Sequence, residues 1–387
     1  MALHPSTLFR SPRAVAVMAG AAAVSVGIFV AVATGAPQPV TSTSTSSPSP
    51  SPTASPTPRR TPRPTPTPSP TPTPEPAAVC PYDGLPVADG VDLEATALGV
   101  QIENHPAARP ARNLSNADMV VEATVEGDTT RFTGIFLCKP TEGMTGPVRS
   151  ARYYSIDLWQ DLHLLTVGFG ASPGSNARFE SAGMPYPNGI NGGWPWYARH
   201  GSRAAPHNLY VDLEGMRDGL TGSASLAALA ARVEAPRAPF AFDAGAPLPA
   251  DGDAAGSVSI QTNSYWRFGW DWDGESESWL RSDAGAAVVD EVTGDRLAAK
   301  TVVVQIVTQE TVYGDPDPGG NPRRLHHLVG SGTGTIFVDG RAFAARWSRP
   351  TASAGTTWTF ANGEPVVLPP GQVWLEIVPT TASVTVR

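Results

Sequence analysis

The sequence predicts an α/β domain followed by an all-β, sandwich- or barrel-like domain, both behind an N-terminal anchor or signal and a long stalk. Strand-like and helix-like segments alternate in residues 79–236, as they do in α/β domains. Short strand-like segments follow one another in residues 250–387 without helical periods between them, which is typical of all-β modules. Residues 37–78 are mostly Pro, Ser and Thr, a composition that cannot bury a core.

Residues 1–36 predict export. Arg10 and Arg13 precede an uncharged run from Ala14 to Gly35, which is the pattern of a signal peptide or a membrane anchor. A run of about 20 apolar residues favours a single-pass anchor in the cell membrane. Ala31-Val32-Ala33 instead fits a cleavage site, which makes a secreted product the alternative. In both cases we expect the folded part outside the cytoplasm, and no lipid attachment at the run because no cysteine directly follows it.

Residues 37–78 predict a disordered, Pro-rich stalk. Pro-rich spacers extend by about 3.1 Å per residue, so a stalk of roughly forty residues reaches on the order of 100 Å. We interpret it as a spacer between the membrane and the folded part.

Two cysteines, Cys80 and Cys138, lie beyond the stalk and therefore in an oxidising compartment. A disulfide between them is the first interpretation, and closing a loop of this length contributes about 4 kcal/mol in the chain-entropy model. The bridge would tie the start of the folded part to its sheet. A catalytic thiol is the weaker interpretation, because only Lys139 adjoins Cys138 as a basic neighbour.

The first domain, residues 79–236, begins with three strand-like segments and continues with alternating helices and strands. The strands are expected in ALGVQIEN, MVVEATVEG and TRFTGIFLC. Helical spacing of Tyr154, Leu158 and Leu162 predicts a helix in RYYSIDLWQDL that packs one face on the sheet. A strand and glycine-rich turn follow in LLTVGFGASPG, and further helices in SNARFESAG, LEGMRDGL and ASLAALAARVE.

The second domain, residues 250–387, contains many short strands separated by turns such as Asn362-Gly363. We expect most of these strands to pair antiparallel. Alternation in WRFGWDWDG places Trp266, Phe268, Trp270 and Trp272 on one face. A small β module needs large side chains to fill its interior, so we interpret this face as core rather than as a sugar-binding platform.

Ionisable residues interrupt the apolar runs of the first domain and predict an anion-binding site. Glu122 and Glu126 are expected on one strand face, and Arg131 opens the next strand. Arg149 and Arg152 are three apart, which on a helical turn places both guanidinium groups on one side. Spare guanidinium groups bind phosphate or carboxylate bidentately. The open alternative is a network of ion pairs that joins sheet to helix and binds no ligand.

Other polar residues near this cluster complete the predicted ligand-binding set. Arg109 would add to the rim, Ser172 belongs to a turn that could accept an anion, and His207 could donate or act as a base, although such a histidine is more often structural. The full set is Arg131, Arg149, Arg152, Glu122, Glu126, Asn104, Arg109, Ser172, His207 and Asn208.

Three apparent motifs carry no catalytic or metal prediction. Gly170 to Gly174 fits the G-x-S-x-G pattern of a nucleophile elbow, but Pro173 has no N–H to donate to an oxyanion. His326 and His327 are adjacent, so they point to different faces of a strand. Asp315 and Asp317 fit a turn and lack the spacing of a calcium loop. We therefore predict no metal and no cofactor.

Several blocks resemble, in order, the YerB-like lipoprotein family, domain of unknown function 3048, across both its N- and C-terminal domains. These blocks are CPYDGLPV, QIENHPAARPARNLSNADMVVEATVEGDTTRF, GPVRSARYYSIDL, GFGASP, APHNLYV, NSYWRFGWDWDGESESWLRS, AKTVVVQIV, GSGTGTIFVDGR and PPGQVWLEIVP. The resemblance implies a bacterial extracytoplasmic protein whose biochemical role is undefined. Family members often carry a lipobox cysteine, whereas this chain has a hydrophobic run and a stalk.

A weaker similarity is to the LytR-CpsA-Psr cell-wall ligases, which are anchored extracytoplasmic α/β domains. The shared order is a strand with an acid, TRF, another strand, PVRSAR with a helix, and a glycine turn. Those proteins hold a polyprenyl pyrophosphate with arginines and carboxylates. Their Asp after the arginine is replaced here by Ser150, so the resemblance implies only anion binding by Arg131, Arg149 and Arg152.

Our main hypothesis is a non-catalytic, membrane-tethered envelope protein whose first domain binds an anionic envelope ligand, with the second domain supporting it or binding an envelope protein. The alternative is a phosphotransferase or ligase-like enzyme acting on a polyprenyl-phosphate-linked glycan, with Glu122 or Glu126 coordinating Mg²⁺. A third class is a structural adaptor. The net charge of -8 and the lack of a basic stripe argue against a nucleic-acid partner.

Overall fold

The structure, a computed structural model, describes residues 78–192, 194–201 and 203–387. The expected anchor or signal, and all of the expected stalk except its last residue, lie outside the described residues. Within the described part, none of the helices has the length and apolar character needed to cross a membrane.

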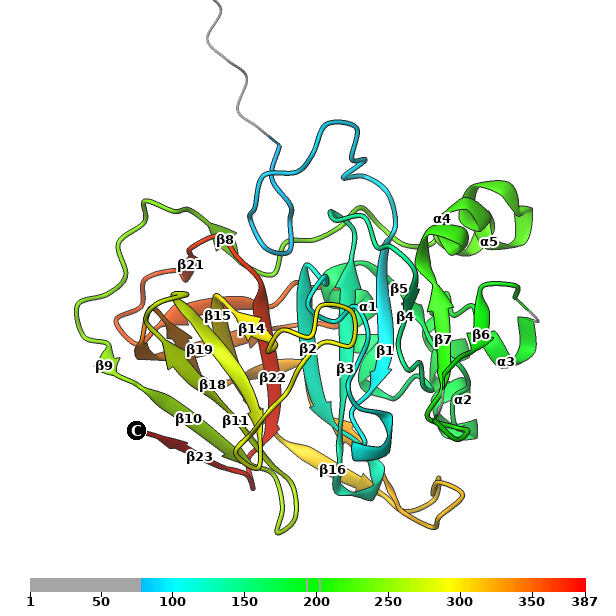
Figure 1. Ribbon diagram of the computed structural model, residues 1–387. Helices are drawn as coiled ribbons and strands as arrows, with labels where there is room; N and C mark the ends of the chain where they lie inside the picture. Colours follow the sequence, from blue (N-terminus) through cyan, green and yellow to red (C-terminus); the bar gives the residue numbers. More distant parts are fainter. Residues whose placement is uncertain (1–77, 193, 202) are drawn as a thin grey trace, which may run out of the picture. The chain divides into compact units, whose positions relative to one another are not determined.

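The described chain is mostly β, with few helices (Figure 1). The strands of the first half are β1 Ala97–Glu103, β2 Met119–Thr124, β3 Thr130–Phe136, β4 Met144–Thr145, β5 Leu164–Val167, β6 Tyr197–Arg199, β7 Leu209–Asp212 and β8 Ala241–Phe242. The second half contributes β9 Asp253–Ala254, β10 Ser257–Gln261, β11 Arg267–Asp273, β12 Ser278–Asp283, β13 Ala286–Ala287, β14 Ala298–Ala299, β15 Thr301–Val307, β16 Gln309–Val312, β17 Arg323–His326, β18 Gly330–Val338, β19 Arg341–Arg349, β20 Thr357–Phe360, β21 Val367–Leu368, β22 Val373–Pro379 and β23 Ser383–Val386.

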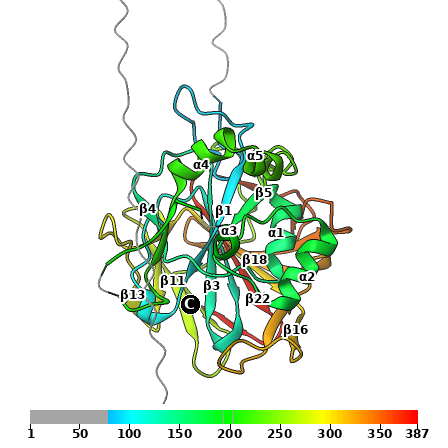
Figure 2. The same ribbon diagram turned by 90° about the vertical axis from the view of Figure 1, so that its right-hand side faces the viewer.

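The helices belong to the first half of the chain. They are α1 Tyr154–Leu162, α2 Pro173–Ala182, α3 Gly189–Gly192, α4 Leu213–Gly222 and α5 Ala224–Ala230, with 3₁₀ turns at η1 Pro106–Ala108 and η2 Glu126–Asp128. The helices α1 and α2 lie side by side (Figure 2). The predicted spacing in α1 is confirmed, since Tyr154, Leu158 and Leu162 are all buried.

A ten-stranded mixed sheet forms the centre of the fold, in the order β5-β1-β3-β2-β22-β15-β18-β19-β20 with β9 beside β19. This central sheet takes strands from both halves of the chain. Strand β22 lies between β15 and β2 and pairs parallel with both (Figure 1). The expected antiparallel pairing therefore fails at β22, and the sheet crosses the stretch between residues 236 and 250 where we place the domain boundary.

A second, antiparallel sheet of β13-β12-β11-β10-β23, with β14 beside β12, covers one face of the central sheet. The interior between them contains Phe132 and Trp374 from the central sheet and Trp270 and Trp279 from the second. The predicted aromatic face is confirmed as core, because Phe268 and Trp270 of β11 are buried in this interior, and Trp272 and the preceding Trp266 pack against it partly buried. The other face of the central sheet packs against α1.

The disulfide Cys80–Cys138 is present, as predicted, and both cysteines are buried. Their Cα atoms are 5.8 Å apart, and the bridge joins the start of the described chain to the residues just after β3. Asp118 accepts the backbone N–H of Cys138 at 2.9 Å, which helps to fix this corner.

An extended segment, residues 147–151, enters the central sheet where β1 and β5 separate. These two strands pair parallel only from Ala97 to Val100 on β1. Beyond that point, the Arg149 N–H donates to the Gln101 carbonyl oxygen at 2.9 Å, and the Phe169 N–H donates to the Arg149 carbonyl oxygen at 2.9 Å. This segment is held extended from both sides, so the expected helical turn at Arg149 and Arg152 is wrong.

Candidate functional site

The predicted ligand-binding residues gather near one end of β1, β2 and β3, where Glu103 lies opposite Arg131 in the register. Eight of the ten belong to three groups, each organised by one carboxylate. We call them the Glu126 group, with Arg131, Arg152 and Arg323; the Glu103 group, with Arg149, His105 and His207; and the Glu122 group, with Asn104, Arg109, Thr130, Arg281, Asp283 and Glu376. Ser172 and Asn208 lie outside all three.

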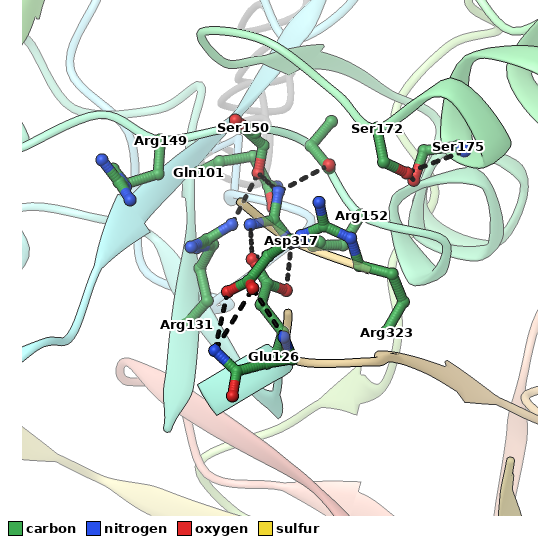
Figure 3. Close-up of polar contacts among 12 residues, drawn as sticks. Gln101, Glu126, Arg131, Arg149, Ser150, Arg152, Ser172, Ser175, Asp317 and Arg323 are labelled. Atoms are coloured by element: carbon green, nitrogen blue, oxygen red, sulfur yellow. Dashed lines mark hydrogen bonds and ion pairs between the residues drawn. The ribbon is translucent and has the colours of Figure 1, made fainter. Parts of the chain in front are cut away.

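In the Glu126 group, two guanidinium groups contact one carboxylate, and a third, that of Arg131, lies beside them (Figure 3). Arg152 donates through Nε to Glu126 Oε2 at 2.7 Å and through Nη2 to Oε1. Arg323 Nη1 lies 2.6 Å from the same Oε1. Arg131 Nη1 donates to the Ser150 carbonyl oxygen at 2.8 Å, and Arg152 Nη1 donates to the same oxygen at 3.0 Å.

Positive charge exceeds negative charge in the Glu126 group. Burial alone raises the pKa of Glu126, but Arg152, Arg131 and Arg323 outweigh burial and hold that pKa well below its ordinary value. Burial, together with the nearby Arg152, lowers the pKa of Arg131 to about 9. Arg131 is 5% exposed, and its Nε has no hydrogen-bond partner among the described residues. The guanidinium groups therefore retain donor capacity that Glu126 does not satisfy.

In the Glu103 group, a carboxylate at the end of β1 binds one arginine and one histidine. Glu103 Oε1 lies 3.3 Å from Arg149 Nε, and Glu103 Oε2 lies 3.1 Å from His207 Nδ1. The His105 ring stacks on the His207 ring, with centroids 5.0 Å apart and planes at 15°. Figure 3 shows the Arg149 guanidinium turned away from those of Arg131 and Arg152, so the three predicted arginines belong to two groups.

The Glu122 group lies between the two sheets. Glu122 accepts from Arg281 Nη2 at 2.9 and 3.1 Å, from Thr130 Oγ1 at 2.5 Å and from Asn104 Nδ2 at 3.2 Å. Arg109 Nε donates to Asn104 Oδ1 at 3.0 Å, and Arg109 also pairs with Asp283. The expectation that Glu122 and Glu126 share a strand face is wrong, because β2 ends at Thr124 and Glu126 begins the η2 turn.

A second acid, Glu376 on β22, lies opposite Glu122 in the register of β2 and β22. Burial, and then repulsion from Glu122, raises the pKa of Glu376 well above its ordinary value, so we infer that Glu376 carries a proton at neutral pH. Trp270 Nε1 donates to Glu376 Oε1 at 2.9 Å. Glu122, Arg281 and Glu376 are buried, and Arg281 of the second sheet pairs with Glu122 of the central sheet, so this group connects the sheets.

Ser172 and Asn208 have partners of their own. Ser172 directly precedes α2 as its N-cap, where its Oγ accepts the Ser175 N–H at 3.1 Å and donates to Asp315. Tyr153 donates its hydroxyl to the same carboxylate at 2.8 Å. A side chain of the loop between β16 and β17 thus occupies the turn that the sequence predicts as anion-accepting. Asn208 Nδ2 donates to the Arg203 carbonyl oxygen at 2.9 Å and supports its own loop.

Sequence reasoning missed Glu103, His105, Arg281 and Arg323. Two of them carried a signal. Arg281 occupies the same strand face as Trp279 in SWLRS, so alternation places it inside, where a charge requires a partner. Glu103 directly precedes Asn104 at the end of an apolar run. Arg323 follows the loop after β16, and its approach to Glu126 depends on contacts that no local pattern encodes.

Metal ligands of the usual kinds come together at one place in residues 78–192, 194–201 and 203–387, namely Cys80, Cys138 and Asp118. The two cysteines there are joined by the disulfide. Glu122 and Glu126, the acids that the enzyme alternative assigns to Mg²⁺, are both engaged by arginines.

Comparisons with known proteins cover most of the described chain. The model of the protein of unknown function (DUF3048) N-terminal domain matches residues 83–225, and the C-terminal domain model matches residues 257–375. YerB of Bacillus subtilis strain 168, which is named as a lipoprotein, is 28% identical over 300 residues, spanning 77% of this chain and 86% of YerB. The crystal structure of YerB from Bacillus subtilis matches with a TM-score of 0.66 and 27% identity, covering 80% of this chain and 99% of that one. This chain therefore belongs to the DUF3048 family and shares the fold of YerB.

Proposed function

We propose that this chain is an extracytoplasmic, membrane-tethered protein of the cell envelope that binds an anionic envelope ligand at the Glu126 group. The observation that carries the proposal is the excess of three guanidinium groups over one carboxylate. Guanidinium groups in such excess bind phosphate or carboxylate oxygens through paired, charge-assisted hydrogen bonds. The unpartnered Nε of Arg131 is one donor that a ligand would satisfy.

The surroundings of the Glu126 group support an anionic ligand. Arg323 joins the group to the neighbouring loop, because its Nε donates to the Asp315 carbonyl oxygen at 3.1 Å. The Asp315 carboxylate accepts hydroxyl hydrogens from Tyr153 and Ser172. An acidic side chain of the chain itself is thus accommodated next to Arg323, which supports a carboxylate or phosphate as the ligand.

The N-terminal sequence supports the location. Residues 14–35 form an uncharged run after two arginines, and residues 37–78 have the composition of a stalk. The relative YerB is named as a lipoprotein. In this chain we assign the membrane tether to the apolar run instead of a lipid.

The test is calorimetric titration of the full chain with inorganic pyrophosphate. We expect saturable binding that Arg131→Gln weakens at least tenfold, because the variant removes one charge-assisted donor, an effect of about 1.4 kcal/mol or more. Arg346→Gln changes an exposed arginine of β19 and should leave the affinity unchanged. Absence of saturable binding, or equal affinity in the Arg131 and Arg346 variants, contradicts the proposal.

A further inference from the structure

The Glu103 group fixes the proton of one imidazole. Glu103 is 5% exposed and engages the Arg149 guanidinium through Oε1, so it is a carboxylate, which can only accept hydrogen bonds. His207 Nδ1, 3.1 Å from Glu103 Oε2, must therefore carry the ring hydrogen. The lone pair then resides on His207 Nε2, which has no hydrogen-bond partner within the described residues. The side chain of His207 is 22% exposed, so solvent reaches it.

The stacked neighbour, His105, has the opposite tautomer. Its Nδ1 accepts the Ala107 N–H at 3.1 Å, so its hydrogen lies on Nε2. Burial, and then the nearby His207, lowers the pKa of His105, which keeps this ring neutral at neutral pH. Because the rings stack at 5.0 Å, an acceptor nitrogen of His207 and a donor nitrogen of His105 belong to one pair of adjacent imidazoles.

Arg149 adds two terminal amino groups without partners. Glu103 engages its Nε, and the described residues offer no partner to its two terminal amino groups. The side chain is 28% exposed, so these amino groups are accessible. They can bind two oxygens of one anionic group. The Glu103 group thus combines a base, a neutral donor and a cation, all oriented by hydrogen bonds or stacking that the fold supplies.

We propose that the Glu103 group hydrolyses phosphodiesters, with His207 as the general base. His207 Nε2 takes a proton from water, the water oxygen bonds to phosphorus, and the bond from phosphorus to the leaving alcohol oxygen breaks on the opposite side. The leaving oxygen takes a proton from solvent, and His207 Nε2 then releases its proton to solvent. Arg149 and the His105 Nε2–H receive the charge on the phosphoryl oxygens. Glu103 holds the imidazole by its Nδ1 and stabilises it while it is protonated.

Charge selects the substrate class. A phosphodiester carries one negative charge and two phosphoryl oxygens, which suit the two free amino groups of Arg149, whereas a neutral carboxylic ester gives Arg149 no ion to bind. This activity goes beyond anion binding and uses residues outside the Glu126 group. Glu103 contacts the imidazole and the Arg149 Nε rather than the reacting atoms, so it is a positioning residue.

The first test needs no substrate. Long-range ¹H–¹⁵N NMR of the full chain at pH 8, with His207→Gln used for assignment, should show His207 as the Nδ1–H tautomer. Finding the Nε2–H tautomer overturns the proposal, because the nitrogen assigned as the base would then carry a hydrogen.

The second test is hydrolysis of bis(p-nitrophenyl) phosphate by the full chain. We expect His207→Gln to lower kcat by about 10²-fold or more, as loss of a general base does. Glu103→Gln should lower kcat with little change in KM, and Arg149→Gln should raise KM. His327→Gln is the matched control, because His327 is an exposed imidazole paired with Glu310 outside this group.

Hydrolysis no faster than in buffer, or equal kcat in the His207 and His327 variants, overturns the proposal. The two proposals fail separately, since His207→Gln should leave pyrophosphate binding at Arg131 intact. The melting temperature of each variant shows whether it is folded. If His207→Gln does not fold, equal kcat in the Glu103→Gln and His327→Gln variants overturns the proposal.

Discussion

Among single residues, the pair Glu122 and Glu376 shows most clearly how burial sets protonation. Both side chains are fully or almost fully buried, face each other across β2 and β22, and share one buried cation, Arg281. Two ionised carboxylates at neighbouring positions of paired strands would repel each other strongly in a poorly hydrated interior. A proton on Glu376 removes that repulsion, so the proton is part of the folded structure.

Glu376→Gln should therefore change how stability depends on pH. The pKa of Glu376 is higher in the folded state than in the unfolded state. The contribution of protonated Glu376 to stability is therefore complete at a pH below its unfolded-state pKa, and it decreases as the pH rises through its folded-state pKa. Glutamine cannot ionise and escapes this decrease. We expect the variant to gain unfolding free energy relative to the native chain between pH 5 and pH 8, measured by urea titration at both values. The control Glu364→Gln changes a residue in an exposed turn and should show no such gain. If the unfolding free energy of Glu376→Gln differs from that of the native chain by the same amount at pH 5 and pH 8, Glu376 does not carry the proton assigned to it.

At the same scale, the candidate site was only partly predictable. Arg131 and Arg152 were recognised because charges in apolar strand ends require partners, and they do meet at the Ser150 carbonyl oxygen. Their companion Arg323 was not recognised, since it approaches through a loop far along the chain. Arg149 was expected to join them, but its extended backbone directs it to Glu103.

Between elements, Arg281 connects β12 of the second sheet to β2 of the central sheet. Its guanidinium lies 4.4 Å from the Phe268 ring centroid and donates to Glu122. A buried ion pair contributes little net stability compared with apolar packing. Removing one partner, however, leaves the other charge buried and unpaired, which is strongly destabilising. The registration of the two sheets therefore depends on both charges being present.

Arg281→Met should lower the unfolding free energy by about 3–5 kcal/mol, because Glu122 is left buried between the sheets without its cationic partner. Arg296→Met is the comparison: its partner Asp271 is 53% exposed, so a loss of about 1 kcal/mol or less is expected. Urea unfolding followed by tryptophan fluorescence measures both. Similar losses in the two variants would mean that the Glu122 group does not join the sheets.

At the scale of the whole molecule, the central sheet unites segments that are remote in sequence. Local periodicity predicted β1 to β3, α1 and the aromatic face of β11, since each depends on spacing within a few residues. The pairing of β2 with β22 had no local signal, because it is determined by which strands meet across the length of the chain. Hence the separate elements were predictable and the shared sheet was not.

A shared sheet implies cooperative unfolding. We expect one thermal transition for the described chain by calorimetry. A fragment ending at residue 250 lacks β22 and the aromatic residues Trp270, Trp279 and Trp374, so it exposes both the edge of β2 and an apolar face. Thermal unfolding followed by circular dichroism should show no cooperative transition for this fragment. A sharp transition would show that the residues up to 250 fold alone and would contradict the expectation.

The position of β22 also makes one strand the link between two halves of the central sheet. Strands β5, β1, β3 and β2 lie on one side of it, and β15, β18, β19 and β20 lie on the other. Residues Val373–Pro379 pair with both sides. Without this one strand the central sheet would be divided in two.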